Sequence, residues 1–119
     1  MNPSVCIIST RTPYHGQNAR EALDSALVSA SYDLDTSLLL MGDGVYQLLD
    51  NQLPEQLSRK SLTAMLKALP MYGIETIFVD AESLQERNLT EDQLVEGFTL
   101  LEEGALAPFI AQHDKVLNF

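Results

Sequence analysis

Hydrophobic residues along this chain alternate between short continuous runs and longer stretches with a helical period. The continuous runs are rich in Val, Ile and Leu, which is typical of strands that are buried on both faces. They occupy residues 4–10, 37–41, 76–79, 98–101 and 115–119. Apolar residues at helical spacing fill the intervals at residues 19–30, 62–69, 81–87 and 106–110. This alternation predicts an α/β fold with three α/β/α layers around a five-stranded, mostly parallel sheet.

Capping residues mark the starts of two of the shorter helical segments. Asp80 stands directly before residues 81–87, where its side chain is expected to cap the helix. Thr90 is followed three positions later by Gln93, which is the spacing of a small capping box.

Length, composition and charge limit the classes of protein to consider. A chain of 119 residues fits a single domain over residues 1–119, and 45% hydrophobic content is ordinary for a globular protein. No apolar stretch approaches the roughly 18 residues of a membrane-spanning helix. Residues 1–4 also lack the basic region of a secretory signal. The net charge of −10, with only seven Lys and Arg residues, opposes direct binding of nucleic acid. We therefore expect neither membrane nor direct nucleic acid binding.

Cys6 is the only cysteine, so the chain cannot form an internal disulfide. This usage fits a reducing, cytoplasmic setting. The neighbours of Cys6 in the first apolar run are Val5, Ile7 and Ile8, which predicts a buried thiol and not an exposed thiolate. A thiol enzyme that uses Cys6 stays open as an alternative, and fast labelling of the native protein would support it.

Ligands in parallel α/β sheets bind beyond the carboxyl ends of the strands, and three loops of this chain qualify. They are residues 11–16, 42–44 and 80–83. Residues 42–44 should form a turn, followed by a short helical piece at 45–49. The candidate residues in these loops are His15, Gly16, Gly42, Asp43, Gly44 and Asp80.

The chemistry of these loops is only weakly marked. The hydroxyls around residues 9–12, before a helix, leave open a flavodoxin-like domain that binds phosphate or flavin. His15 could act as an acid or base, but the local sequence supplies no nucleophile beside it. The glycine-rich nucleotide motifs and the spacing of metal ligands are missing. We expect no catalytic residue, no cofactor and no metal.

Several segments together resemble the DsrF/TusC family of the DsrE-like superfamily. The most specific is residues 41–49 (MGDGVYQLL), which is similar to that family's D-G-V-(F/Y)-Q-L-L segment. Further similar segments, in the family's order and spacing, are residues 13–16 (PYHG), 19–24 (AREALD), 69–75 (LPMYGIE), 83–89 (SLQERNL) and 114–119 (DKVLNF). The likeness covers nearly the whole chain and implies a DsrEFH-like domain that is flavodoxin-like in its general architecture.

The resemblance also implies a function. Members of this family assemble with TusB-like and TusD-like subunits into a heterohexamer, a dimer of trimers that relays persulfide sulfur to the wobble uridine of tRNA. The TusD-like subunit carries the working cysteine near the end of its third strand. Residues 77–81 (IFVDA) match that position and contain no cysteine. The resemblance therefore implies a non-catalytic subunit, with a DsrEFH-type role in sulfur oxidation as the alternative pathway.

A subunit of this kind needs surfaces for its partners. Aromatic and methionine side chains are enriched at protein interfaces. The candidates are Tyr46, Leu48, Leu49, Met71 and Tyr72, although these side chains could equally fill the core.

Overall fold

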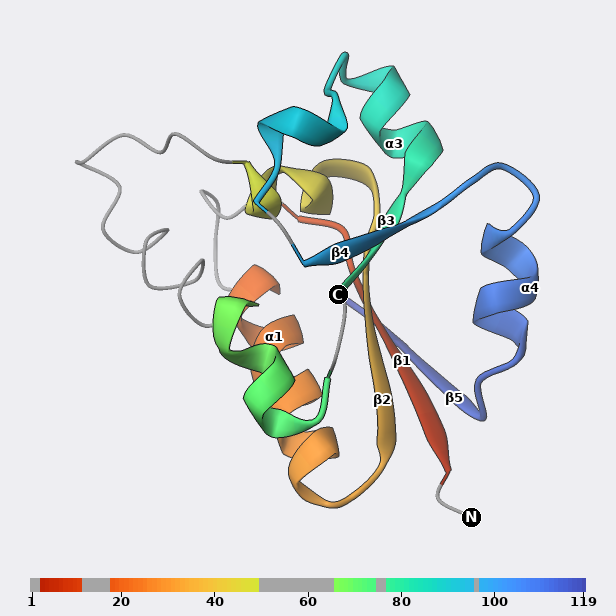
Figure 1. Ribbon diagram of the computed structural model, residues 1–119. Helices are drawn as coiled ribbons and strands as arrows, with labels where there is room; N and C mark the ends of the chain where they lie inside the picture. Colours follow the sequence, from red (N-terminus) through yellow and green to blue (C-terminus); the bar gives the residue numbers. More distant parts are fainter. Residues whose placement is uncertain (1–2, 12–17, 50–65, 75–76, 96) are drawn as a thin grey trace.

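The computed structural model describes residues 3–11, 18–49, 66–74, 77–95 and 97–119. Its centre is a five-stranded sheet with the order β4-β3-β2-β1-β5, in which every pairing is parallel (Figure 1). The strands are β1 (Ser4–Ser9), β2 (Asp35–Leu40), β3 (Ile77–Asp80), β4 (Phe98–Leu101) and β5 (Lys115–Asn118). The predicted five-stranded sheet is therefore confirmed, with ends that shift by one or two residues.

Side chains of the inner strands alternate between two apolar cores, one on each face of the sheet. On β1, Val5 and Ile7 join the larger core, whereas Cys6 and Ile8 join the smaller one. Residues of β2 divide in the same way. Because both faces are covered, these strands appear in the sequence as continuous apolar runs.

The two faces carry different helices. Helix α1 (Asn18–Ser31) buries Ala19, Ala22, Leu23 and Ala26 against the larger core. Helix α4 (Leu106–Ala111) covers the smaller core, where the Phe78 and Phe109 rings lie 4.4 Å apart. Figure 1 shows α1 and α4 on opposite sides of the sheet, so the predicted three layers are confirmed.

Short helical elements connect the strands. Helix α3 (Ala81–Glu86) directly follows β3, and the described residues also include three 3-10 helices. They are η1 (Gly42–Leu48), η2 (Leu69–Tyr72) and η3 (Glu91–Gln93). At the start of η3, the Thr90 N–H donates to Gln93 Oε1 at 2.8 Å, so the small capping box expected there does form.

The helical piece expected at residues 45–49 is confirmed over most of its length, but two local details were wrong. The 3-10 helix η1 already begins at Gly42, so the separate turn expected at residues 42–44 is its first turn. Asp80 occupies the N-cap position of α3, but its side chain makes no capping bond to the backbone. The Ser83 hydroxyl donates to Asp80 Oδ2 at 2.6 Å instead, because a hydroxyl in the first turn competes with backbone amides for the carboxylate.

The order of the strands identifies where a ligand crevice would form. The chain proceeds outward from β1 through β2 and β3 to β4, and then returns to the other side of β1 to form β5. The order in which the chain adds strands across the sheet reverses between β1 and β5. Open α/β sheets bind ligands at such a switch point. This order also differs from the 2-1-3-4-5 order of flavodoxin, so the likeness to flavodoxins is limited to the layers.

Candidate functional site

The carboxyl ends of β2 and β3 are joined by a buried polar cluster. Ser83 and Asp80 are only 3% and 6% exposed. The Ser83 hydroxyl donates to Asp80 and accepts a hydrogen bond from the Gly42 N–H at 2.9 Å. Gly42 has a φ of +53°, a conformation that glycine adopts without strain. The Gly42 amide, which could have held an anion, is therefore already bonded to Ser83.

An ion pair covers the solvent side of this cluster. Arg87, which follows α3, donates through Nε to Asp43 Oδ1 at 3.1 Å and also donates to the Ser83 carbonyl oxygen. The Asp43 side chain is 54% exposed, so the pair contributes modestly to stability. Its main effect is to hold the start of η1 against α3. Figure 1 shows η1 and α3 grouped at this end of the sheet.

A buried glutamine joins η1 to the end of β1. Gln47 is 2% exposed, and its Nε2 donates to Ser9 Oγ at 2.8 Å and to the Arg11 carbonyl oxygen at 3.1 Å. Gly44 packs so closely that a Cβ there would lie 2.0 Å from the Ser9 carbonyl oxygen. Glycine at position 44 is thus required by close approach to β1.

The switch point between β1 and β5 is bridged by the chain itself. The Thr10 N–H and hydroxyl both donate to the Phe119 carbonyl oxygen, at 3.0 and 2.7 Å. The Phe119 N–H donates to the Ile8 carbonyl oxygen at 2.8 Å. These bonds occupy backbone groups at the place where a ligand of an open α/β sheet would bind.

Cys6 lies away from the strand ends, in the smaller core. It is fully buried, and this burial raises the pKa of its thiol from 9.0 to about 11. The thiolate is the form that attacks disulfides and persulfides, so both access and ionisation oppose such a reaction here. The predicted buried thiol is confirmed.

His113 is a structural side chain in this fold. Its Nδ1 lies 2.9 Å from the Phe109 carbonyl oxygen, and its Nε2 lies 3.0 Å from Ser37 Oγ. The ring also meets Phe109 edge to face at 4.9 Å between centroids. His113 therefore fastens the end of α4 to β2.

The strand-end candidates divide between described and undescribed parts of the chain. Gly42, Asp43 and Gly44 follow the end of β2, and Asp80 is the last residue of β3, so these four lie at strand ends. Gly42 and Asp80 are linked through Ser83, whereas Gly44 packs on Ser9 of β1. His15 and Gly16 lie outside the described residues. The flavin or phosphate alternative, which depends on that loop, therefore stays an untested prediction.

Sequence reasoning missed the partners that organise this site, which are Gln47, Ser83 and Arg87. The one signal for Gln47 is a polar residue within the apolar segment at 45–49. A polar residue in such a place is either at the surface or hydrogen-bonded in the core.

The five candidate interface residues differ widely in exposure. Met71 and Tyr72 on η2 are 87% and 56% exposed, and Tyr46 and Leu49 are half-buried. Leu48 is 1% exposed and lies in the larger core, so for this residue the core alternative holds and the interface role does not. An amphipathic 3-10 segment turns neighbouring side chains to different sides, and the sequence did not show which side was inward.

Clusters of three or more His, Cys, Asp or Glu that could hold a metal ion do not occur among the described residues. Within that same part of the chain, no helix has the length and apolar character needed to cross a membrane.

This architecture defines the class of the protein: a parallel α/β domain whose described strand ends hold a hydrogen-bonded polar cluster and no thiol. The model of the DsrE/DsrF-like family matches residues 3–119, and the chain belongs to that family.

Its relatives include proteins named for TusC and a protein named for DsrF. "Protein TusC homolog" of Pseudomonas aeruginosa is 41% identical over 118 residues, which cover 99% of each chain. "Protein TusC" of Escherichia fergusonii is 33% identical over 97% of this chain and 98% of its own. "Intracellular sulfur oxidation protein DsrF" of Allochromatium vinosum is 37% identical over 89 residues, 75% of this chain and 65% of its own.

A solved structure shares the fold over the full length. The crystal structure of the ychN protein from E. coli superposes with a TM-score of 0.77, covers all of both chains and is 24% identical in sequence. This match supports the five-stranded fold alone.

Proposed function

We propose that this protein is a non-catalytic subunit of a TusBCD-type sulfurtransferase complex, in the sulfur relay that leads to 2-thiolation of the wobble uridine in tRNA. The observation that carries the proposal is the end of β3. A buried Asp80–Ser83 pair occupies the place that, by the family resemblance, corresponds to the working cysteine of the TusD-like subunit. Likeness to proteins named TusC, over nearly the whole chain, supports the choice of this complex.

The chemistry of sulfur relay supports a non-catalytic role. Persulfide transfer needs an accessible thiolate, which attacks a sulfur and takes it over. The sequence has one cysteine, and it is fully buried with its pKa raised to about 11. Sulfur would therefore travel through cysteines of the partner chains, while this subunit helps to form the particle.

The proposed partners are one TusB-like and one TusD-like subunit, in a heterohexamer that is a dimer of trimers. The net charge of −10 favours contact with protein over direct contact with tRNA. We place the particle in the cytoplasm, where a single reduced cysteine is expected. Among the candidate interface residues, Met71 and Tyr72 are accessible enough to meet a partner.

A role in sulfur oxidation is the second candidate, and the likeness to DsrF favours it. The two roles differ in the acceptor of the sulfur and not in what this subunit contributes. Loss of tRNA 2-thiouridine on deletion of the gene would support the first role, whereas intact tRNA thiolation with impaired sulfur oxidation would support the second.

Co-expression tests the assembly itself. The chain is produced with the TusB-like and TusD-like proteins of the same genome and analysed by size-exclusion chromatography with light scattering. A particle with two copies of each chain is expected. If this chain elutes alone while the other two associate, the proposed role is contradicted, and ligand screening becomes the next step.

A further inference from the structure

Strand β5 forms an open edge of the sheet, because none of the described strands pairs with its outer side. Successive residues of a strand direct their N–H and C=O groups to opposite edges. The Phe119 N–H and carbonyl oxygen both bond to β1, through Ile8 and Thr10. By this alternation, Leu117 also faces β1, and the backbone groups of Val116 and Asn118 point outward.

The side chains of β5 follow the same alternation. Val116 and Asn118 are in register with Cys6 and Ile8, so they stand on the side of the sheet that α4 covers. Val116 is 40% exposed there. Leu117 stands on the opposite side, against the larger core.

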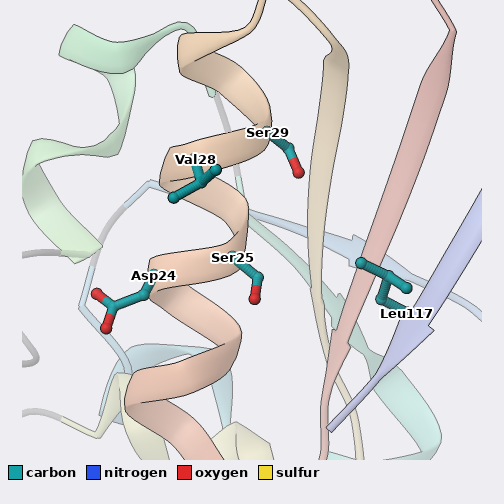
Figure 2. Close-up of a pocket in the computed structure, with 5 residues that line it drawn as sticks. All are labelled: Asp24, Ser25, Val28, Ser29 and Leu117. Atoms are coloured by element: carbon teal, nitrogen blue, oxygen red, sulfur yellow. The ribbon is translucent and has the colours of Figure 1, made fainter.

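A hollow lies directly beside this open edge. It has a volume of about 340 Å³ and is lined by Asp24, Ser25, Val28, Ser29 and Leu117. In Figure 2, Ser25 and Ser29 point from α1 toward the strands, and Leu117 of β5 stands across from them. The hollow is thus positioned to receive a side chain that arrives along the outer side of β5.

An open strand edge and a neighbouring side-chain pocket are the two features that β-strand addition uses. Main-chain hydrogen bonds supply affinity, and pockets for alternate side chains supply specificity. We propose that β5 is the docking edge for an extended segment of a partner subunit, which pairs with Val116 and Asn118 and places one small or apolar side chain in the hollow. This inference rests on the proposed function, since it names one surface, besides Met71 and Tyr72 on η2, through which the chain would join its complex.

The negative charge of this protein favours a different chain, and not a second copy of this one, as the partner that pairs with β5. Each copy carries a net charge of −10, so pairing two copies edge to edge would bring like charges together. At the rim of the hollow, Asp24 shares its carboxylate with Arg20 across an exposed 3.4 Å contact. A neutral or basic partner segment is electrostatically more compatible with this edge and its hollow than another acidic chain is.

Amide hydrogen exchange tests the docking edge residue by residue. The free chain and the complex co-expressed with the TusB-like and TusD-like proteins are exchanged, quenched and analysed by NMR. In the free chain, the Val116 and Asn118 amides should exchange fast and the Leu117 amide slowly. In the complex, exchange at Val116 and Asn118 should slow by at least about tenfold, because an added strand protects amides that pointed to solvent.

Each other outcome has a distinct meaning. A stable complex in which Val116 and Asn118 exchange as fast as in the free chain refutes the docking edge and leaves the proposed function standing. Protection of both amides in the free chain, rising with its concentration, also refutes the proposal, since it means pairing between copies. Failure to form any complex refutes the proposed function itself.

Two variants provide an independent measurement of the same edge. Ser25→Arg fills the hollow, and Ser31→Arg makes the same change at an exposed serine near the end of α1 that does not line it. Partner affinity should fall at least about tenfold for Ser25→Arg and stay near wild type for Ser31→Arg. Equal affinities for both folded variants would overturn the proposal.

Discussion

Among the glycines in the described part of the chain, Gly44 has the least room for a side chain, and Gly44→Ala should therefore destabilise the fold strongly. A Cβ at this position would lie 2.0 Å from the Ser9 carbonyl oxygen and 2.8 Å from the Ser9 carbonyl carbon, whereas ordinary contact begins at 3.4 Å. Both atoms belong to the backbone of β1, so no side-chain rotation can relieve the contact.

The loss of stability can be worked out from the backbone movement that would relieve this contact. Relief requires η1 and β1 to separate by about 1.4 Å, with overpacking strain of about 1–3 kcal/mol. That movement also strains the bond from the Met41 N–H to the Ser9 carbonyl oxygen and the bond from Gln47 to Ser9 Oγ, at roughly 1 kcal/mol each. We expect the free energy of unfolding to fall by about 3–5 kcal/mol, and Tm to fall by about 12 °C or more.

Urea denaturation of the purified chain, followed by circular dichroism, measures this effect. Gly104→Ala is the matched control, because a Cβ there meets nothing within 4 Å and the φ of +90° alone opposes alanine. That variant should cost about 1–2 kcal/mol. A loss for Gly44→Ala within about 1 kcal/mol of the Gly104→Ala loss would refute the close-packing argument.

Three further predictions follow from the buried polar groups. Ser83→Ala should lower the free energy of unfolding by about 2–3 kcal/mol, because it leaves Asp80 and the Gly42 N–H without their buried partner. The control Ser31→Ala, at an exposed hydroxyl, should cost under about 1 kcal/mol by the same urea denaturation, and equal losses would contradict this account. A thiol reagent at pH 8 should label native Cys6 only at the rate of unfolding, and labelling as fast as in urea would contradict its burial. Because burial raises the pKa of Cys6 to about 11, deprotonation of this thiol favours the unfolded chain. The free energy of unfolding of the wild type, measured relative to that of Cys6→Ala, should be constant below pH 9 and fall by about 2 kcal/mol as the pH approaches 11. A difference between the two proteins that does not change with pH would contradict the raised pKa.

The strands were predictable because burial on both faces forces apolar residues at consecutive positions. Val5 to Ile8 serve two different cores, and this double burial is visible as a continuous run. The edge strands were harder to predict, because they are less buried and their sequences are less uniformly apolar. In β5, Lys115, Val116 and Asn118 are exposed, so that run is short and mixed.

The polar cluster was predictable only in part. Placing Asp80 and Gly42 at strand ends needed no more than the pattern of strands, and both are found there. The bond between Gly42 and Ser83 depends on β2 and β3 being neighbours, which the order of elements along the chain does not state. The same holds for Gln47, which reaches Ser9 across 38 positions of sequence.

The most direct test of a non-catalytic role is tRNA thiolation in a strain that lacks this gene, complemented with wild-type protein, Cys6→Ala or Cys6→Val. Amounts of the assembled complex are measured alongside, so that a folding defect is distinguished from a lost reaction. The proposed role predicts that 2-thiouridine disappears on deletion and returns to the wild-type level with every variant that assembles. Thiolation that persists without the gene, or that fails when an assembled complex lacks Cys6, would contradict it.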